Sequence, residues 1–268
     1  MRGISAEGLA VSTERLESVA AAGDAERLGA ELFSVADLVS REGSLRRAMT
    51  DPSASPAAKT GLARTVLNGK VADPTVEVVA TAAGAKWSST SDFVHALEQL
   101  GALALVISAE RADQLSDLED ELFRFGRVVA GNPQLRDALT NKHAPVAHRQ
   151  ALVSSLLEGK ATKPAIRLAV QAVGSRDHSF ETALEDYQDL AAKRQESVIA
   201  LVRTAIALNE QERARLADVL SRQYGRNIHL NVVVDPAILG GIKVELGDDV
   251  IDGSVAGRLD DARRRMVG

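Results

Sequence analysis

The sequence predicts a mostly α-helical protein made of two tandem small helical bundles followed by a small α/β C-terminal domain. Two observations predict this fold class. Most of the chain carries a duplicated pattern of amphipathic helices, and its last quarter carries segments that alternate with the period of strands. We therefore expect three domains, at residues 1–100, 101–194 and 195–268.

The helical pattern is a duplication with an offset of 90 residues. Residues 31–86 align without a gap onto 121–176, and 17 of the 56 aligned positions are identical. The i, i+4, i+7, i+11 stripe of an amphipathic helix also recurs, so both stripes are expected to face a core. Its members are Leu28, Leu32, Val35 and Val39 in the first copy, and Leu118, Leu122, Phe125 and Val129 in the second.

Proline and glycine mark the expected helix ends. Ser55-Pro56 and Asp73-Pro74 each place a capping residue before a proline at the first helical position. Gly69 and Gly159 are expected to end helices, and residues 87–90 to form a turn inside the first bundle. Each copy is longer than the usual solenoid repeat of about 34–45 residues, so each can form a bundle with its own core.

The C-terminal region is expected to begin with a strand and a capped helix. Residues 197–203 predict a strand, and Asn209 with Glu212 three positions later forms a capping-box arrangement. Gly225 is expected to end this helix. Residues 228–234 then alternate as a strand that is buried on one face.

A bend, a hairpin and a second capped helix complete the expected order. Gly240-Gly241 allows a bend, and residues 242–246 alternate as a strand. Residues 247–249 turn the chain into a buried Val250-Ile251 pair as a hairpin. Residues 252–254 are expected to cap a closing helix. One face of that helix carries Val255, Leu259, Ala262 and Met266.

This C-terminal run resembles the signature of the δ subunit of F-type ATP synthases, relatives of the mitochondrial oligomycin-sensitivity-conferring protein. The resemblance covers roughly residues 197–266 and rests on segments 235–236, 239–242, 250–255 and 257–259. We expect the motif residues to serve the fold or a partner contact. They are Gly240, Gly241, Asp252, Gly253, Ser254, Arg258 and Leu259.

The resemblance implies a non-catalytic peripheral-stalk, or stator, subunit. Such a subunit clamps the catalytic head to the b stalk, so that rotor torque drives ATP synthesis. In this family the helical domain, a six-helix bundle that normally occurs once, holds N-terminal segments of the α subunits. The α/β domain meets the C-terminal end of the b-type subunit. The implied location is the cytoplasmic side of the cell membrane, and which copy binds α is left open.

Composition argues against several other function classes. The formal net charge is −5 with acids and bases interspersed, which does not fit a nucleic-acid-binding face. The chain has no cysteine, so disulfides, zinc–thiolate sites and thiol catalysis are excluded. We see no signal peptide and no apolar run near the ~20 residues that cross a bilayer. Membrane association is therefore expected only through a complex.

No catalytic, cofactor or metal site is expected. The Gly-Lys pairs at 69–70 and 159–160 lack the earlier glycine and the following Ser or Thr of a phosphate loop. The acids at 248–252 lack the ligand spacing of a calcium loop, and there is no Gly-x-Ser-x-Gly elbow. Basic residues 263–265 are expected to complement a helix dipole. Surface positions are expected for the scattered histidines, which are His95, His143, His148, His178 and His229.

From the residues alone, the chain is a binding protein whose interhelical grooves suit amphipathic partner helices. A soluble helical adaptor outside any ATPase is therefore the alternative to a stator subunit, and copurification separates the two. An enzyme whose α/β domain binds a phosphorylated ligand is a further rival. It would need a polar cluster in a pocket, and the sequence offers none.

Overall fold

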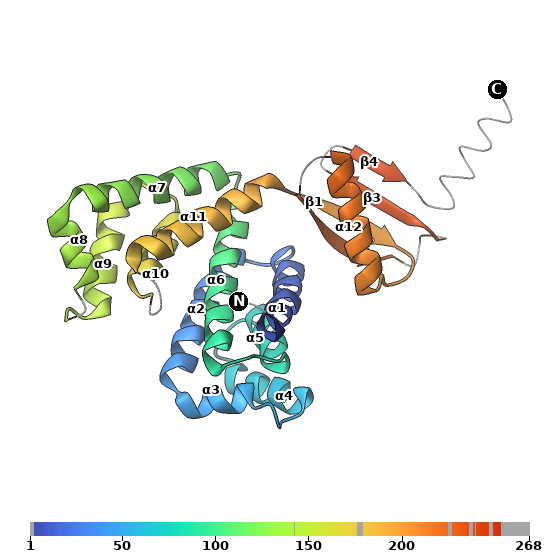
Figure 1. Cartoon of the computed structure of the whole chain (residues 1–268), viewed down its shortest axis with the longest axis horizontal. Helices are drawn as coiled ribbons and strands as arrows, with labels where there is room; N and C mark the ends of the chain where they lie inside the picture. The colour runs from blue at the N-terminus through green and yellow to red at the C-terminus, as the bar shows by residue number, and fades with distance from the viewer. Residues whose placement is uncertain are drawn as a thin grey trace. The chain divides into compact units, whose positions relative to one another are not determined.

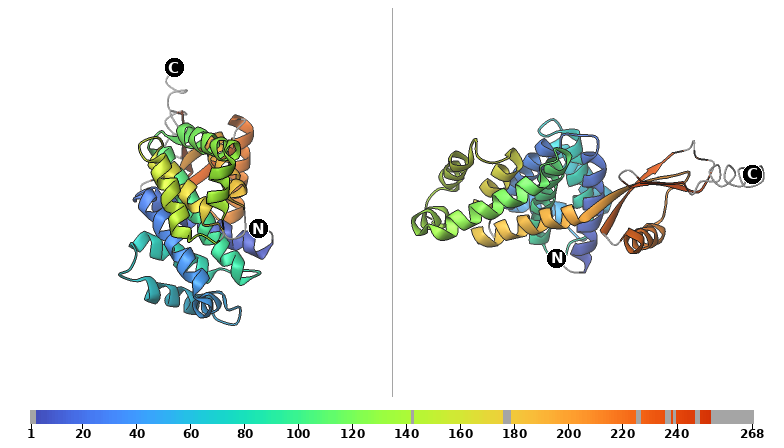
Figure 2. Two further views of the ribbon diagram at one scale, coloured as in Figure 1. Left: turned by 90° about the vertical axis from the view of Figure 1, so that its left-hand side faces the viewer. Right: turned by 90° about the horizontal axis from the view of Figure 1, so that it is seen from above.

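The computed structural model describes residues 3–141, 143–175, 179–224, 227–235, 238, 240–246 and 249–252. The chain divides into two compact units, Met1–Ala192 and Lys193–Gly268. The described part of the first unit is helical, and the second unit contains a four-stranded sheet with one helix (Figures 1 and 2). The predicted fold class, mostly α with a small α/β C-terminal part, is confirmed.

The duplication recurs in three dimensions, because α2 to α5 and α7 to α10 have matching bounds at the offset of 90. The one difference is that α10 ends one residue early. The helices are α1 (Ile4–Ala20), α2 (Ala25–Arg41), α3 (Gly43–Thr50), α4 (Pro56–Leu67), α5 (Asp73–Gly84), α6 (Thr90–Arg111), α7 (Leu115–Gly131), α8 (Pro133–Thr140), α9 (Val146–Leu157), α10 (Lys163–Val173) and α11 (Phe180–Glu196).

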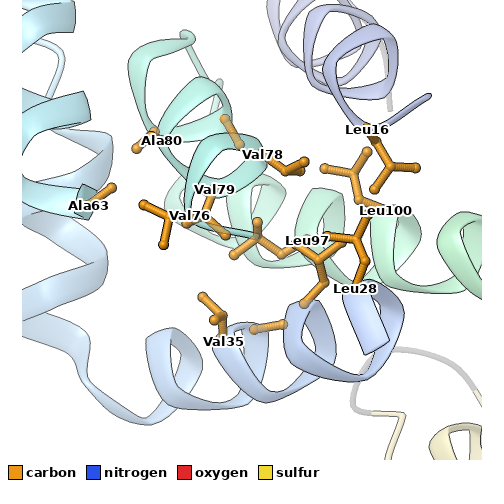
Figure 3. Close-up of a cluster of buried hydrophobic side chains, with 14 of the residues drawn as sticks. Leu16, Leu28, Val35, Ala63, Val76, Val78, Val79, Ala80, Leu97 and Leu100 are labelled. Carbon is orange, nitrogen blue, oxygen red and sulfur yellow. The ribbon is translucent and has the colours of Figure 1, made fainter. Parts of the chain in front are cut away.

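Both predicted apolar stripes are buried, as expected. Every member of each stripe is at most 5% exposed. The first stripe packs into the core shown in Figure 3, together with residues of α1, α4, α5 and α6. The second stripe packs with residues of α8, α9, α10 and α11 in a second core.

Helix α6 contributes to both of these cores. Phe93, Leu97 and Leu100 belong to the first core, whereas Leu105 and Val106 belong to the second. In the sequence duplication, α6 has two counterparts. Its start aligns in sequence with the start of α11, and α1 shifted by 90 residues falls within α6. The boundary expected at residue 100 lies inside this shared helix.

The double role explains why residues 100–107 of α6 form an unbroken apolar run. By length and by a mean hydropathy of 1.3 over 18 residues, it is the one helix among the described residues that could span a membrane. However, 67% of that stretch is buried within the protein, as expected for a helix enclosed by two cores.

Two glycines allow α2 and α6 to cross at close range. A Cβ atom on Gly29 would lie 2.9 Å from the carbonyl oxygen of Gly101. A Cβ atom on Gly101 would in turn lie 3.1 Å from the ring of Phe33. The first copy is therefore fastened to the shared helix through this crossing.

A glutamate from α2 or α7 holds the start of the fourth helix of each repeat. Glu31 accepts hydrogen bonds from the backbone N of Ala72 (2.9 Å) and the hydroxyl of Thr75 (2.5 Å). Glu121 accepts hydrogen bonds from the backbone N and the hydroxyl of Thr162, at 2.8 and 2.7 Å. The backbone contact recurs at the sequence offset, because Thr162 matches Ala72. The hydroxyl donor differs between the copies, because Thr75 matches Ala165.

The helix-end predictions are mostly confirmed. Ser55 caps α4, accepting from the backbone N of Ala58. Gly69 and Gly159 follow the ends of α4 and α9, both at φ 71°. The prediction that Asp73 caps α5 is wrong, because Ala72 is the N-cap and Asp73 lies in the first turn.

The second unit is a βαβ unit extended by a hairpin. Its elements are β1 (Ser197–Thr204), α12 (Glu210–Tyr224), β2 (Asn227–Val234), β3 (Ile242–Leu246) and β4 (Asp249–Asp252). The sheet order is β2-β1-β3-β4, with β1 and β2 parallel and the other pairs antiparallel. The core beneath α12 is formed by Ala200, Val202, Leu220, Ile228, Val244 and Leu246.

Most local predictions in this unit are confirmed. Asn209 and Glu212 exchange two hydrogen bonds of 2.9 Å, which is the predicted capping box. The predicted burial of Val250 is wrong: it is 57% exposed because it pairs with Glu245, on the sheet face away from α12. Val234, at the end of β2, is also exposed. The expected closing helix lies outside the described residues.

Candidate partner-binding site

The first unit contains a cleft of about 1090 Å³ between α2 and the helices of the second copy. Apolar side chains, most of them buried, line it together with polar and charged side chains. The apolar lining includes Phe33, Leu105, Leu139, Val146, Val170, Val173 and Phe180; the charged lining is Asp37, Arg41, Glu98, Arg149 and Arg167. Such a surface can take an amphipathic segment.

Polar contacts between helices fix the walls of this cleft. Arg167 of α10 forms an ion pair of 2.9 Å with Glu26 of α2, which joins the two copies. Arg149 of α9 donates to the carbonyl oxygens of Leu139 and Val173, at the ends of α8 and α10. A cation at these carbonyls also complements the helix dipoles.

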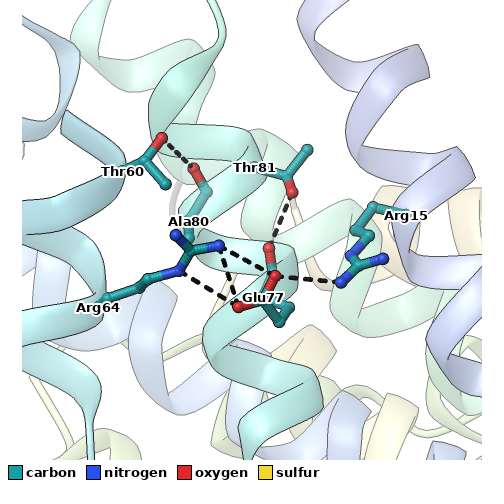
Figure 4. A network of polar contacts seen from close by, with 6 residues as sticks. All are labelled: Arg15, Thr60, Arg64, Glu77, Ala80 and Thr81. Atoms are coloured by element: carbon teal, nitrogen blue, oxygen red, sulfur yellow. Dashed lines mark hydrogen bonds and ion pairs between the residues drawn. The ribbon is translucent and has the colours of Figure 1, made fainter. Parts of the chain in front are cut away.

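The matched region of the first copy is closed by an ion-pair network (Figure 4). Arg15 of α1 and Arg64 of α4 donate to Glu77 of α5, at 3.0 to 3.2 Å. The hydrogen bond from Arg64 is the largest cause that lowers the pKa of Glu77. Three helices are thereby tied together at one carboxylate.

The second copy lacks this network. The positions that match Arg15, Arg64 and Glu77 hold Leu105, Ser154 and Arg167. Charge is therefore reversed at the α10 position, and Arg167 turns to the first copy instead. The two bundles share a fold but present different surfaces.

The described residues of the C-terminal motif gather at one end of the sheet. Gly240 (φ 118°) and Gly241 (φ 88°) adopt backbone conformations that side chains disfavour. They lead into β3, which pairs with the end of β1 at Thr204 and with the end of β4 at Asp252. Gly253, Ser254, Arg258 and Leu259 lie outside the described residues.

Nothing in the described part of the chain resembles a metal centre. It contains no cluster of three His, Cys, Asp or Glu side chains that could hold a metal ion. His143 and His148 are exposed and His95 is half-buried. The Gly-Lys pairs lie just beyond the ends of α4 and α9, and their glycines have positive φ.

Comparison with known proteins decides the family. The model of the family described as ATP synthase delta (OSCP) subunit matches residues 97–266. An ATP synthase subunit delta of Kineococcus radiotolerans is 47% identical over 91% of this chain and 89% of its own. Relatives with the same description from Thermobifida fusca (42%, all of both chains) and Streptomyces avermitilis (44%, 99% and 98%) span the duplication as well.

The chain belongs to the ATP synthase delta (OSCP) subunit family. It is therefore a non-catalytic, structural subunit of the peripheral stalk of an F-type ATP synthase. It acts as part of that membrane-bound complex in ATP synthesis. A soluble adaptor outside any ATPase is not favoured.

Sequence reasoning missed several features that matter for the delta-subunit surface. Glu26 and Arg167 are 141 positions apart, so no local sequence pattern predicts their ion pair. The same holds for the cleft, whose walls come from distant parts of the chain. The shared α6 did leave a signal: its start aligns with α11 at an offset of 87, whereas the preceding helices align at 90. A Glu-Leu-Phe triplet at residues 31–33, which recurs at residues 121–123, likewise marked Glu31 and Glu121.

Proposed function

We propose that this delta subunit holds N-terminal segments of the α subunits in the cleft of its first unit, and the C-terminal end of a b-type subunit on its second. The observation that carries the proposal is the cleft, which is lined by both apolar and charged side chains. A helical turn about 10 Å wide and 5.4 Å long occupies roughly 400 Å³. The volume of about 1090 Å³ therefore suits two to three turns of an amphipathic helix.

This arrangement serves the mechanics of a stator. Rotor torque would spin the catalytic head unless the head is held to the stalk. Several moderate contacts on one chain release slowly, because each raises the effective concentration of the others. We place the subunit on the cytoplasmic side of the cell membrane, attached through the complex and without contact to nucleic acid.

The proposal divides the chain at 1–100, 101–194 and 195–268. In the last of these, the family motif is a folding element, in which Gly240 and Gly241 set the bend. We propose that residues 252–254, Arg258 and Leu259 serve the fold or a partner contact as well. A contact of these residues with b is compatible with the same role.

The second copy is the better candidate for direct contact with α. The family model, which begins at residue 97, covers the second copy and the C-terminal unit. Helices α8 to α10 also supply much of the cleft lining. In the first copy, the Glu77 network already ties the matched helices together. We therefore assign the first copy to bracing, against the stalk or a neighbouring α segment.

Purification and site-specific crosslinking test these assignments. The complex purified from the native membrane should contain α and b chains together with this chain. A photocrosslinker on a single cysteine at Ser154 should then reach α in higher yield than one at the matched Arg64. Because Arg64 belongs to the Glu77 network, the exposed pair Ser155 and Thr65 provides a second comparison. Equal or reversed yields overturn the assignment of copies, whereas absence of α and b from the preparation overturns the proposed function.

A further inference from the structure

The repeated Glu-Leu-Phe triplet keeps two of its three roles in both copies. Glu31 and Glu121 hold the starts of α5 and α10. The leucines that follow them are at most 1% exposed in the two cores. Helices α2 and α7 therefore have the same rotation in their bundles. The third residue differs, because Phe33 is 7% exposed and Phe123 is 55% exposed.

In the first copy, the shared helix covers this phenylalanine. Phe33 belongs to the second core, and its ring approaches the bare backbone of Gly101. Two helical turns earlier on the same face of α2, Glu26 pairs with Arg167 of α10. This face of α2 thus docks against two helices, with Phe33 beside a small residue of α6 and Glu26 beside a cation of α10.

The corresponding face of α7 carries Ser116, Asp120, Phe123 and Arg127, all of them exposed. Asp120 is neutralised by Arg124 in an i, i+4 ion pair. Arg127 has no ion pair within the described part of the chain, and it replaces Asp37 of the first copy. The face therefore keeps the aromatic anchor of α2 but reverses the charge beside it.

We infer that this α7 face, defined by Ser116, Asp120, Phe123 and Arg127, docks an amphipathic helix of another subunit. The inference rests on the proposed function, since it requires the assembled stator. By analogy with α2, the helix presents a small residue to Phe123. By charge complementarity, it presents a carboxylate to Arg127. Interface hot spots are enriched in large aromatic residues and arginine that become buried on binding.

Matched variants of the full chain in the complex separate docking from folding. Phe33→Ala leaves a cavity in the core, so it should lower the thermal midpoint of the isolated subunit. Phe123→Ala should leave that midpoint unchanged, yet reduce retention of the subunit on salt-washed membranes about tenfold. Arg127→Glu should reduce retention as well, and Arg127→Lys should largely preserve it.

A benzophenone probe on Phe123→Cys identifies the occupant, with Asp117→Cys as an exposed control on the same helix. The expected adduct joins residue 123 to a helical peptide of another subunit that carries a carboxylate within one turn. The inference would be overturned if the Phe123 and Arg127 variants were retained on membranes as well as the wild type. It would also be overturned if the probe at 123 formed its adduct with residues 193–268 of the same chain, or if probes at 117 and 123 crosslinked the other subunit in equal yield. Failure of the wild-type subunit to copurify with α and b would instead refute the proposed function.

Discussion

At the scale of single residues, a few buried or half-buried polar groups determine how the helices join. Glu31 is the clearest example, because one carboxylate receives hydrogen bonds from the start of α5 and an ion pair from Arg27 on its own helix. Burial by itself raises the pKa of Glu31. The hydrogen bonds from Thr75, Arg27 and Ala72 outweigh it, so the pKa lies below its ordinary value.

Replacing Glu31 with Gln should therefore lower stability in a pH-dependent way. A carboxyl group whose pKa is lowered in the folded state contributes stability above its unfolded pKa of about 4.3, and loses it as pH falls through the folded value. The expected loss at pH 7 is about 1–2 kcal/mol of unfolding free energy. Below about pH 4 the difference between variant and wild type should shrink.

Chemical denaturation at neutral and acid pH measures this difference. Glu158→Gln, at an exposed position just after α9, is the control and should change stability little. An equal loss at both pH values for Glu31→Gln would show that the side chain acts through packing and not through its charge.

Local features at the residue scale could be read from the sequence. The Ser55 cap, the capping box at Asn209 and the helix-ending glycines depend on neighbours within about five residues. The role of Glu31 could not, because its partners lie 41 and 44 positions away. For the same reason, the sequence predicts Asp73 as the cap of α5, whereas the carboxylate of Glu31 binds the backbone N of Ala72 at that helix start.

At the scale of elements, the helical stripes were predictable because 3.6-residue periodicity belongs to each helix alone. The sharing of α6 was not, since a helix buried between two cores has no polar face to reveal its period. In the sheet, alternation correctly assigned Val244 and Leu246 to the core. It failed for Val250, whose side is set by pairing with Glu245.

The glycine bend that leads into β3 should be intolerant of side chains. Gly241 has φ 88°, so Gly241→Val should cost about 1–3 kcal/mol through backbone strain. In contrast, a Cβ atom on Gly61 in α4 would meet nothing within 4 Å. Gly61→Ala should therefore leave stability unchanged or raise it by about 0.4–1 kcal/mol. Thermal melts of the two variants measure these changes. An unchanged midpoint for Gly241→Val, together with loss of the subunit from the complex, would show that the bend serves partner recognition and not folding.

At the scale of the whole molecule, the duplication produces one helical unit with two surfaces. The copies share α6, are joined by Glu26 and Arg167, and enclose the cleft between them. A stator gains from this arrangement, because a shared helix leaves no flexible linker between the bundles. The position of the cleft depended on that sharing, and therefore could not be read from either repeat alone.

The shared helix predicts that the two bundles unfold together. Leu97 lies in the first core, Leu168 in the second and Val244 in the sheet core, all of them buried. Leu97→Ala and Leu168→Ala should each cost about 2–5 kcal/mol. Because α6 couples the cores, either change should speed hydrogen exchange by a similar factor across α1 to α10, and leave β1 to β4 unaffected. Val244→Ala should do the reverse. If Leu97→Ala speeds exchange only in α1 to α5, the copies are energetically separate and α6 joins them without coupling them.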